Sequence, residues 1–446
     1  MRLVRRIVIS VFGVIGFLIL GLSVFLFWVF AAQPVYDGEI ASENVSAEVQ
    51  IIRDINGVPH IFASTFDDAA FGIGLAQAED RGWQLEVLRR AARGRLSEVF
   101  GASMINADTV YRAYGMPEVV DITMSRYDAS TKRTLQRFAD GVNAAIADGR
   151  YQRSPEFRLM FVTLEEWTLR DVGAVMSIIT GTAEDYMNEA EAVLLEAELG
   201  DEKSAELLAP IPVDFPTLYR DIGILGDTSG EAIEQPTSAD AIDRPGTNFF
   251  VFGGAKTSTG KPILAVDPHL PLTAPGIVYP VSVVLPDNVV RGGAWVGSPA
   301  IAFGHNKDIA WGMTHLPADT SDLIAERVDP ADPTKYLTTD GSKAFKLRTT
   351  EFRVRGRTQP VSLTLRETQN GIVLSDHDPH LKAVADALGE GHIIVHRQVN
   401  RVYGASIIAP LVKISLANDW RSFRAASAEY EWQNNIAYAD IDGNIG

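Results

Sequence analysis

The sequence contains no cysteine among its 446 residues, and that absence excludes several kinds of protein. A disulfide framework, a cysteine nucleophile and a thiolate metal site are all impossible. Basic residues are also scarce: 40 lysines and arginines face 57 aspartates and glutamates, so the formal net charge is −17. Nucleic-acid binding needs a concentrated basic surface, so this composition argues against a nucleic-acid partner. A hydrophobic content of 46% is enough for a sizeable core.

Several motifs of hydrolases and nucleotide-binding proteins are missing as well. The chain has no G-x-S-x-G elbow, no H-E-x-x-H pair and no Walker A loop, and in residues 254–261 the glycine spacing is one residue too long for that loop. His392 and His396 fall in an expected strand, where four residues at ~3.3 Å each would hold the rings ~13 Å apart, too far to share a metal. His377 and His380 stay open as a metal site in a loop, although solvated loop histidines are the simpler interpretation.

The N-terminus carries a long apolar run. Residues 7–32 contain no charged residue and exceed the ~20 residues that a helix needs to cross a bilayer. Arg2, Arg5 and Arg6 precede the run, which predicts a cytoplasmic N-terminus. We therefore expect residues 1–34 to form a cytoplasmic tip and an uncleaved transmembrane anchor in the inner membrane, with the body in the periplasm. A cleaved signal peptide is the alternative interpretation.

The rest of the chain divides by pattern. Residues 49–53 alternate as a strand does and lead to Asn56-Gly57, a hairpin signal, and residues 79–99 carry apolar positions at helical spacing. The many arginines and glutamates of this helix predict a solvated, ion-paired face. Helical periods continue to about residue 209, so residues 35–226 form a mainly helical region. The small, polar residues 227–246 predict a flexible linker, and residues 247–446 are rich in strands. The expected strands are 248–252, 262–266, 281–285, 309–313, 352–354, 361–365 and 392–395.

One local arrangement indicates chemistry. The two strands on either side of residues 253–261 predict a hairpin, and if its turn is centred between Ser258 and Thr259, cross-strand partners sum to 517. Thr247 then faces Leu270, beside His269. A hydroxyl directly after Gly246, at the end of an exposed linker, suggests self-cleavage, because the freed α-amine of Thr247 can act as base for its own hydroxyl. The alternative is an ordinary turn that enters a strand.

At these residues the sequence resembles the penicillin acylase family of N-terminal-nucleophile hydrolases, over nearly all of the chain after the anchor. The resemblance is carried by short motifs in the same order, namely residues 53–61 (RDINGVPHI), 76–81 (AQAEDR), 89–98 (RRAARGRLSE), 246–248 (GTN), 260–270 (GKPILAVDPHL), 309–314 (IAWGMT) and 438–446 (YADIDGNIG). It implies an α+β fold, an αββα sandwich with a mainly helical N-terminal chain. It also implies a precursor that cuts itself between Gly246 and Thr247, releases a spacer (227–246) and leaves two chains.

The resemblance also implies roles for individual residues. Thr247 stands where the family has its nucleophile, and His269 where members that act on cephalosporins or acylated homoserine lactones often have a histidine that contacts the nucleophile's amine. The backbone N–H of His315 and the side chain of Asn435 match the two donors that stabilise the oxyanion. The expected reaction is hydrolysis of a linear amide bond in an acylated small molecule, penicillin-like, cephalosporin-like or N-acyl homoserine lactone-like, through an acyl-enzyme.

The same resemblance implies a structural calcium ion but no cofactor for the chemistry. Asp319 and Asp322 align with calcium ligands of the family, and Glu189 is a candidate third ligand from the helical region. Oxygen ligands of this kind suit calcium. Loop carboxylates without a metal are the alternative.

The sequence departs from the family pattern in several places. Threonine stands where serine is usual, and Asn370-Gly371 stands where members often have His-Gly. The chain ends at Gly446, where roughly a few hundred more residues are expected, including an arginine that supports Asn435. Phe249, Phe250 and Phe252 near the nucleophile suggest an apolar acyl group, or else aromatics buried in a strand.

Two other functions stay open from the sequence. A membrane-anchored binding protein of the same fold, a pseudoenzyme that never matures, is the main alternative to the hydrolase. A metal-dependent hydrolase built on His377 and His380 is the other.

Overall fold

The structure is a computed structural model that describes residues 2–162, 164–181, 186–207, 247–270, 272–316, 320–399 and 404–446. Gly246 and the expected linker 227–246 lie outside the described residues, as does Asp319. The domain boundaries expected from the sequence therefore stay predictions.

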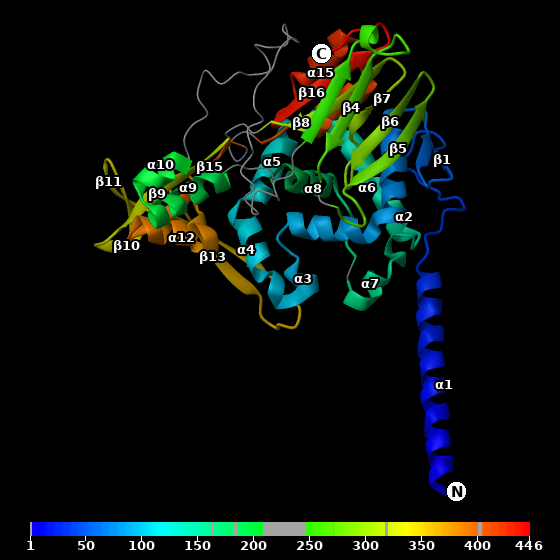
Figure 1. Cartoon of the computed structure of the whole chain (residues 1–446), viewed down its shortest axis with the longest axis horizontal. Helices are drawn as coiled ribbons and strands as arrows, with labels where there is room; N and C mark the ends of the chain where they lie inside the picture. The colour runs from blue at the N-terminus through cyan, green and yellow to red at the C-terminus, as the bar shows by residue number, and fades with distance from the viewer. Residues whose placement is uncertain are drawn as a thin grey trace, which may run out of the picture.

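The first helix stands apart from the body. Helix α1 (Arg2–Ala31) extends away from it at one side (Figure 1). Its segment Ile9–Trp28 has a mean hydropathy of 2.6 and none of it is buried against the rest of the chain. Such a helix is long and apolar enough to cross a membrane, and a signal sequence has the same length and composition. The structure thus agrees with an apolar N-terminal segment and does not distinguish an anchor from a signal sequence.

The first half of the body is helical, as expected. Its long helices are α2 and α6, which approach so closely that a Cβ on Gly74 would lie 2.1 Å from the carbonyl oxygen of Phe138. Thr65 and Asp128 cap the two helices by accepting hydrogen bonds from backbone N–H groups of the first turn. The helices of this half are α2 (Phe66–Ala92), α3 (Ser97–Phe100), α4 (Ile105–Ala113), α5 (Met116–Arg126), α6 (Ala129–Ala147), α7 (Pro155–Met160), α8 (Leu169–Gly181), α9 (Tyr186–Leu199) and α10 (Asp201–Leu207), with short 3₁₀ turns at Gly101–Met104 and Tyr151–Arg153.

The expected helix over residues 79–99 begins earlier and ends earlier, because α2 stops at Ala92 and the chain bends before α3. The prediction that its charged face is solvated is wrong. Glu86 is 0% exposed, Arg89 1% and Arg90 5%. Glu86 accepts hydrogen bonds of 2.6 Å from Arg89 and 2.9 Å from Arg90, so the charges are paired as expected but lie inside the protein.

The large sheet joins the two halves of the chain. Strand β2 pairs in parallel with β5, and this pairing places the hairpin β1–β2 at one edge, with Asn56-Gly57 in its turn as predicted. The strand order is β1 (Gln50–Arg53), β2 (Pro59–Phe62), β5 (Val278–Leu285), β6 (Asn288–Trp295), β7 (Ile301–His305), β8 (Ile309–His315) and β16 (Asn434–Asp440).

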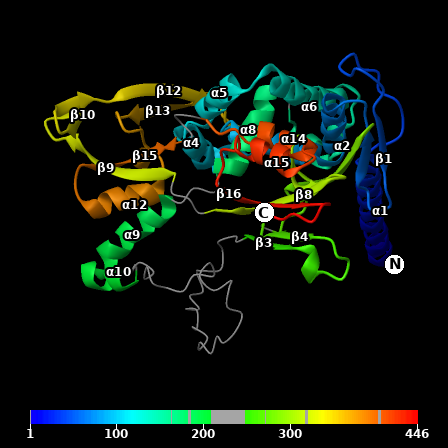
Figure 2. The same ribbon diagram turned by 90° about the horizontal axis from the view of Figure 1, so that it is seen from above.

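Helices cover one face of this sheet, and the main hydrophobic core lies between the helices and the sheet (Figure 2). Gln77 of α2 ties the two layers together, because its amide oxygen accepts from the N–H of Gly297 at 2.8 Å and its amide nitrogen donates to the carbonyl of Ser298 at 3.2 Å. The helices on this face include α2, α6 and α8, and also α14 (Ile408–Leu416) and α15 (Trp420–Ser427).

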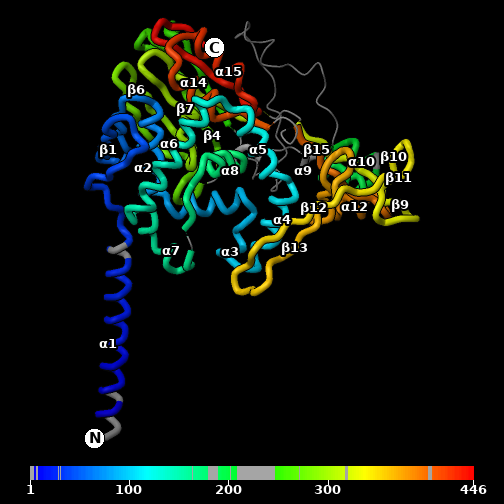
Figure 3. Tube along the Cα trace, turned by 180° about the vertical axis from the view of Figure 1, so that it is seen from behind, coloured from blue at the N-terminus to red at the C-terminus, as the bar shows by residue number. Residues whose placement is uncertain are grey.

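A second sheet of seven strands lies to one side of the body, as the tube view from behind also shows (Figure 3). Helices α9 and α12 (Pro379–Leu388) pack against it and against each other. The expected strand 352–354 is wrong beyond Phe352, since β12 ends there, and the other expected strands lie within or overlap observed ones. The order is β11 (Gly341–Ala344), β10 (Asp332–Thr338), β9 (Ser321–Asp329), β15 (His392–Gln398), β14 (Ile372–Val373), β13 (Val361–Glu367) and β12 (Lys346–Phe352).

A two-stranded sheet, β3 (Thr247–Phe252) and β4 (Ile263–Pro268), covers the other face of the large sheet over β8 and β16 (Figure 2). The described residues thus form a helical layer, the large sheet, a two-stranded sheet on its other face and the second seven-stranded sheet to one side. An αββα sandwich has a further helical layer, which is not among the described residues. The α+β class is confirmed, and the full sandwich stays a prediction.

Candidate functional site

The hairpin that carries Thr247 forms as expected, with a different register. Thr247 lies opposite Pro268, not Leu270, so partners sum to 515. The predicted register is wrong because the turn contains a 3₁₀ helix (Gly254–Lys256) and is centred between Thr257 and Ser258. A shift of two residues keeps every side chain on its expected face of the pleat. His269 therefore stays next to the residue opposite Thr247, but it follows that residue, whereas in the expected register it preceded it.

A glycine lets the hairpin lie close to the large sheet. Gly312 in β8 faces Val266 of β4, and a Cβ on this glycine would lie 2.0 Å from a methyl carbon of Val266 and 3.3 Å from one of Leu264. Any larger residue would push the hairpin outward. The side chains of Thr314 and Asn435 face the same side of the sheet as Gly312, because Thr314 is two residues along β8 and Asn435 is its cross-strand partner.

The close approach brings the threonine hydroxyl to the end of β8. The backbone N–H of His315 donates a hydrogen bond of 2.7 Å to Oγ1 of Thr247, across 68 positions of sequence. Both residues are partly buried. The structure thus brings together two residues that the sequence placed in one site, the expected nucleophile and an expected oxyanion donor.

Asn435 lies beside this contact, on the neighbouring strand β16. Its side-chain nitrogen is 3.4 Å from Oγ1 of Thr314, the residue before His315. The preceding residue, Asn434, is held more firmly: its nitrogen donates to the carbonyl of Thr314 at 2.9 Å, and its oxygen accepts from the hydroxyl of Tyr430 at 2.8 Å. Burial raises the pKa of Tyr430, so the phenol stays a neutral donor to Asn434.

His269 lies at the end of the hairpin next to Thr247. Its Nε2 is 3.2 Å from the side-chain nitrogen of Asn248 and 3.1 Å from Oδ2 of Asp267. The imidazole side chain is 46% exposed. Asn248 and Asp267 lie on the exposed face of the hairpin, so these contacts hold the ring on the face opposite to the Thr247 side chain. The expected contact of the ring with a free α-amine concerns a chain cut after Gly246, which is outside the described residues.

The three phenylalanines of β3 divide between its two faces. Phe249 shares the face of Thr247 and is partly buried. Phe250 and Phe252 are 58% and 47% exposed and stack on each other with ring centroids 6.4 Å apart. The interpretation of these rings as buried strand aromatics is therefore wrong for Phe250 and Phe252.

The candidate calcium ligands come from different parts of the chain. Glu189 of α9 accepts a hydrogen bond of 2.8 Å from the backbone N–H of Leu323, the residue after Asp322 in β9. Glu189, from the helical region, therefore contacts the strand that carries Asp322, through the backbone of the next residue. Among the described residues no group of three or more histidine or carboxylate side chains forms a metal cluster. Asp319, the third candidate, is not among them.

The remaining histidine candidates are separated. His392 and His396 lie in β15, as the apolar residues between them predict. His377 follows a short 3₁₀ helix and His380 lies in the first turn of α12, which Asp378 caps, so the expected loop is in part a helix. Desolvation lowers the pKa of His377. The described residues around this pair include no third ligand, so nothing here favours a metal-dependent hydrolase.

Comparison with known proteins shows the family of the chain. A sequence profile described as penicillin amidase matches residues 48–446. The chain belongs to the penicillin amidase family. Members with which it is similar include the acyl-homoserine lactone acylase QuiP of Pseudomonas fluorescens strain Pf-5, which is 26% identical over 369 residues, or 80% of this chain and 44% of that protein. The penicillin acylase 2 proenzyme of Pseudomonas sp. strain SE83 is 30% identical over 67% of this chain and 40% of its own length.

The penicillin G acylase of Escherichia coli is 25% identical over 91% of this chain and 54% of its own length. The chain thus spans about half the length of the curated family members that it matches. A solved structure of thermostable penicillin G acylase from Alcaligenes faecalis, in orthorhombic form, is also similar, with a TM-score of 0.38 and 22% identity over 44% of this chain and 34% of that one.

Sequence reasoning missed three residues that shape the site. Gly312 permits the close approach of the hairpin, while Asn248 and Asp267 hold His269. Gly312 lies inside one of the motifs shared with the penicillin amidase family, and a glycine within a strand marks a close backbone approach, which was the available signal. Asn248 and Asp267 give no comparable signal, since only the register places them side by side.

Proposed function

We propose that the natural protein is a self-processing amidohydrolase that cuts the Gly246–Thr247 bond and then uses Thr247 as its nucleophile. The observation that carries the proposal is the hydrogen bond of 2.7 Å from the backbone N–H of His315 to Oγ1 of Thr247. It supports the proposal because the hydroxyl of the first residue of a strand, where cleavage would expose an α-amine, lies beside a backbone N–H that could donate to an oxyanion.

The proposed chemistry needs few groups. A free α-amine has a pKa of about 8, so it can accept the hydroxyl proton while Oγ1 attacks the substrate carbonyl. The negative charge that develops on the carbonyl oxygen is stabilised by the N–H of His315 and the side chain of Asn435. The amine then returns the proton to the leaving nitrogen, and water hydrolyses the acyl-enzyme. Asn435 fits this role because it faces the hairpin side of the sheet, one residue from the end of β8.

His269 is proposed to contact the freed amine. Its place in the chain supports this role, because His269 follows Pro268, the cross-strand partner of Thr247. Nε2 can either accept from the side-chain nitrogen of Asn248 or donate to Asp267, so one of these two hydrogen bonds orients the ring at a time.

The proposed substrate is an acylated small molecule with a linear amide. The similar proteins are named for penicillins and for acyl-homoserine lactones, and both names fit that description. Phe249 is the phenylalanine of β3 that shares the face of Thr247, so an apolar acyl group would lie on that side.

The assembly is part of the same proposal. After cleavage and loss of residues 227–246, the two chains would stay together through the shared large sheet, in which β2 from one chain pairs with β5 from the other. The whole protein would complete an αββα sandwich. We propose that α1 is an uncleaved inner-membrane anchor with the body in the periplasm, and that Glu189, Asp319 and Asp322 hold a structural calcium ion. Their carboxylates are the ligand type that calcium prefers.

The deciding experiment is N-terminal sequencing of every band of the whole protein purified from membranes. A band that begins at Thr247 supports the proposal, and its absence in Thr247→Ala shows that the threonine performs the cut. A single uncut band in the wild type that binds small amides tightly would favour the binding-protein alternative. Normal amide turnover by Thr247→Ala would overturn the proposal.

A further inference from the structure

An exposed basic turn joins β12 to β13, outside the candidate active site. This turn, residues 353–360, contains Arg353, Arg355 and Arg357 and no acidic residue, and we refer to it as the arginine turn. All three arginines are exposed. The side chains of Arg353 and Arg357 have no hydrogen-bond or ion-pair partner in the part of the chain that the structure describes. Arg355 donates to the carbonyl of Val99 at 3.1 Å.

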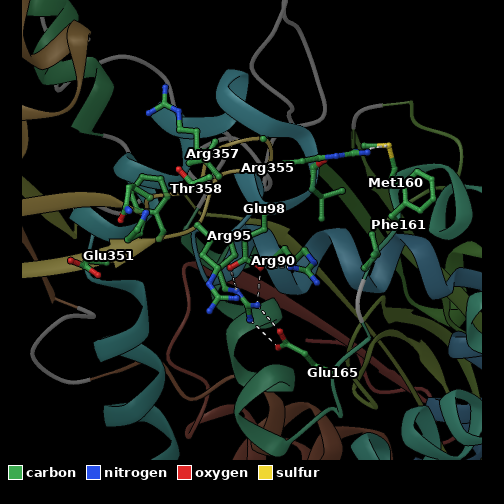
Figure 4. A pocket seen from close by; sticks show the side chains of 18 of the residues that line it. Arg90, Arg95, Glu98, Met160, Phe161, Glu165, Glu351, Arg355, Arg357 and Thr358 are labelled. Carbon is green, nitrogen blue, oxygen red and sulfur yellow. Dashed lines mark hydrogen bonds and ion pairs between the residues drawn. The ribbon is translucent and has the colours of Figure 1, made fainter.

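Two of the three glutamates beside the arginine turn are already paired. The turn borders a cavity of about 1030 Å³ that also contains Glu98 and Glu165 (Figure 4). Glu98 accepts hydrogen bonds from Arg90 and Arg95, and Glu165 accepts two from Arg95 at 2.9 and 2.6 Å. The third glutamate, Glu351, also lines the cavity and is exposed. The three arginines of the turn therefore outnumber the one carboxylate beside them that has no arginine partner among the described residues, in a chain whose net charge is −17.

Apolar side chains lie next to the arginine turn at the end of α7. Leu159 is 57% exposed and Phe161 83% exposed. Phe161 has a positive φ of 51°, a conformation that a bulky residue rarely adopts. Arg355 reaches toward this segment, with its guanidinium 3.7 Å from the sulfur of Met160, and Figure 4 shows Phe161 beside that contact. Arginine together with exposed aromatic and aliphatic side chains is the composition of a surface that binds anionic lipid.

The connection to α1 fixes which side of the body faces the helix. Arg150 donates to the carbonyls of Val35 and Asp37 at 3.0 and 3.1 Å, and Arg153 donates to the carbonyl of Gln33 at 2.6 Å. The guanidinium of Arg53 lies 4.1 Å from the ring centre of Tyr36. The segment that follows α1 is thus bound to the body over several residues and is not a flexible linker.

The arginine turn and α7 lie on the side of the body toward which α1 extends. In Figures 1 and 3 both reach the level of the C-terminal end of α1, and Figure 2 looks nearly along the axis of that helix. A bilayer crossed by Ile9–Trp28 would bring its headgroups to this level. We propose that the arginine turn and the end of α7 form a docking surface for the anionic phospholipid headgroups of the membrane that holds α1. The proposal rests on the anchor assigned under the proposed function.

The expected loss of docking follows from the number of arginines that are replaced. Each basic side chain at an anionic lipid surface raises the ratio of docked to undocked body by a factor of about five. Replacing Arg353 and Arg357 should therefore reduce the ratio of docked to undocked body roughly 25-fold. The same variant leaves Arg355 and its contact with Val99 in place. Raised salt should also lower the ratio of docked to undocked body, because it screens the attraction between arginine and lipid.

These 446 residues contain no cysteine, so a single introduced cysteine can be labelled without a background from this part of the protein, and any cysteine outside it is replaced by serine first. The whole protein is placed in nanodiscs of phosphatidylcholine alone or with phosphatidylglycerol, and an NBD label at Thr358→Cys reports quenching by nitroxide-bearing lipid. A label at Ser258→Cys, in the hairpin turn on the far side of the body, is the control position. A label at Ser23→Cys, within α1, reports insertion of the helix.

We expect the Thr358 label to be quenched in discs that contain phosphatidylglycerol, with little quenching in phosphatidylcholine or at Ser258. The double variant Arg353→Gln with Arg357→Gln should lose the quenching of the Thr358 label in these discs. The matched double variant Arg291→Gln with Arg421→Gln should retain it. Equal quenching in both lipids, or equal loss in the matched pair, would overturn the docking surface. An unquenched Ser23 label would overturn the anchor and the docking together, whereas cleavage at Thr247 and amide hydrolysis, measured on the same sample, test the proposed enzyme separately.

Discussion

Thr247 and His315 are 68 positions apart in the sequence, yet the backbone N–H of His315 donates a hydrogen bond of 2.7 Å to the hydroxyl of Thr247. Two strands from different layers meet at this contact, β3 of the hairpin and β8 of the large sheet. The proposed nucleophile therefore lies beside the backbone N–H that we propose as an oxyanion donor.

The first prediction concerns the nucleophile. Thr247→Ser keeps the hydroxyl and removes only the methyl group, so we expect it to cut itself and to hydrolyse substrate at least as fast as the wild type. Thr247→Ala lacks the hydroxyl and should stay uncut and inactive. Mass spectrometry of the chains over a time course, followed by an amide-hydrolysis assay, gives both results. Slower processing by the serine variant would mean that the methyl group helps to position the hydroxyl.

The second prediction concerns Asn435. If its side chain donates to the oxyanion, Asn435→Ala should lower kcat about 10²–10³-fold, or about 2.7–4 kcal/mol of transition-state stabilisation, with little change in KM. Asn434→Ala is the matched control, since Asn434 binds the carbonyl of Thr314 and the hydroxyl of Tyr430. That variant should lose about 1–3 kcal/mol of stability and keep kcat within tenfold. Equal effects on kcat from both variants would argue against an oxyanion role for Asn435.

The third prediction tests the close approach of the hairpin. In Gly312→Ala the new Cβ would lie 2.0 Å from Val266, so the hairpin must move outward and carry Thr247 away from His315. We expect slower self-cleavage and a loss of about 1–3 kcal/mol in the free energy of unfolding. Val266→Ala in the same chain removes the clash and should restore cleavage in part. Gly276→Ala, where the nearest atom to a new Cβ is 4.0 Å away, should change neither quantity.

Much of this site could be predicted from the sequence because local pattern decides it. The alternation around residues 248–252 and 262–266 predicts the hairpin, and the small polar residues before Thr247 predict an exposed approach to it. The register could not be predicted, since a 3₁₀ helix within the turn moved its centre by one residue. The ion-pair cluster of Glu86, Arg89 and Arg90 was predicted to be solvated because buried and exposed ion pairs have the same helical spacing. Only the tertiary fold shows that α2 packs this charged face inside the protein.

The order of the second sheet was equally out of reach. Its central neighbours β9 and β15 are separated by several strands in the sequence, and no local pattern specifies that pairing. The same is true of Glu189 and Leu323, whose contact joins the helical region to β9.

The fourth prediction concerns calcium. If Glu189 and Asp322 are ligands, a chelator should lower the thermal unfolding midpoint, and calcium at 100 times its Kd should restore about 2.7 kcal/mol. Glu189→Gln and Asp322→Asn should each abolish the difference between calcium and chelator. Glu198→Gln, at the exposed end of the same helix, should retain it. A calcium effect that survives in both ligand variants would place the ion elsewhere.

The fifth prediction concerns the acid sensitivity of Glu165. Its hydrogen bonds with Arg95 lower the pKa of this carboxyl from 4.5 to about 2. Because the folded pKa is lower than the unfolded value, the pair stabilises the fold fully above pH 4.5, and this stability is lost as the pH falls toward 2. The Glu165 side chain is 39% exposed, so solvent screening limits the effect to about 1 kcal/mol. Urea unfolding at several pH values should show a loss of stability between pH 5 and pH 2.5 that is smaller by that amount in Glu165→Gln. The control Glu166→Gln, which changes the exposed neighbouring glutamate, should show the same pH dependence of stability as the wild type. If the free energy of unfolding of Glu165→Gln has the same pH dependence as that of the wild type, the pair with Arg95 does not stabilise the fold.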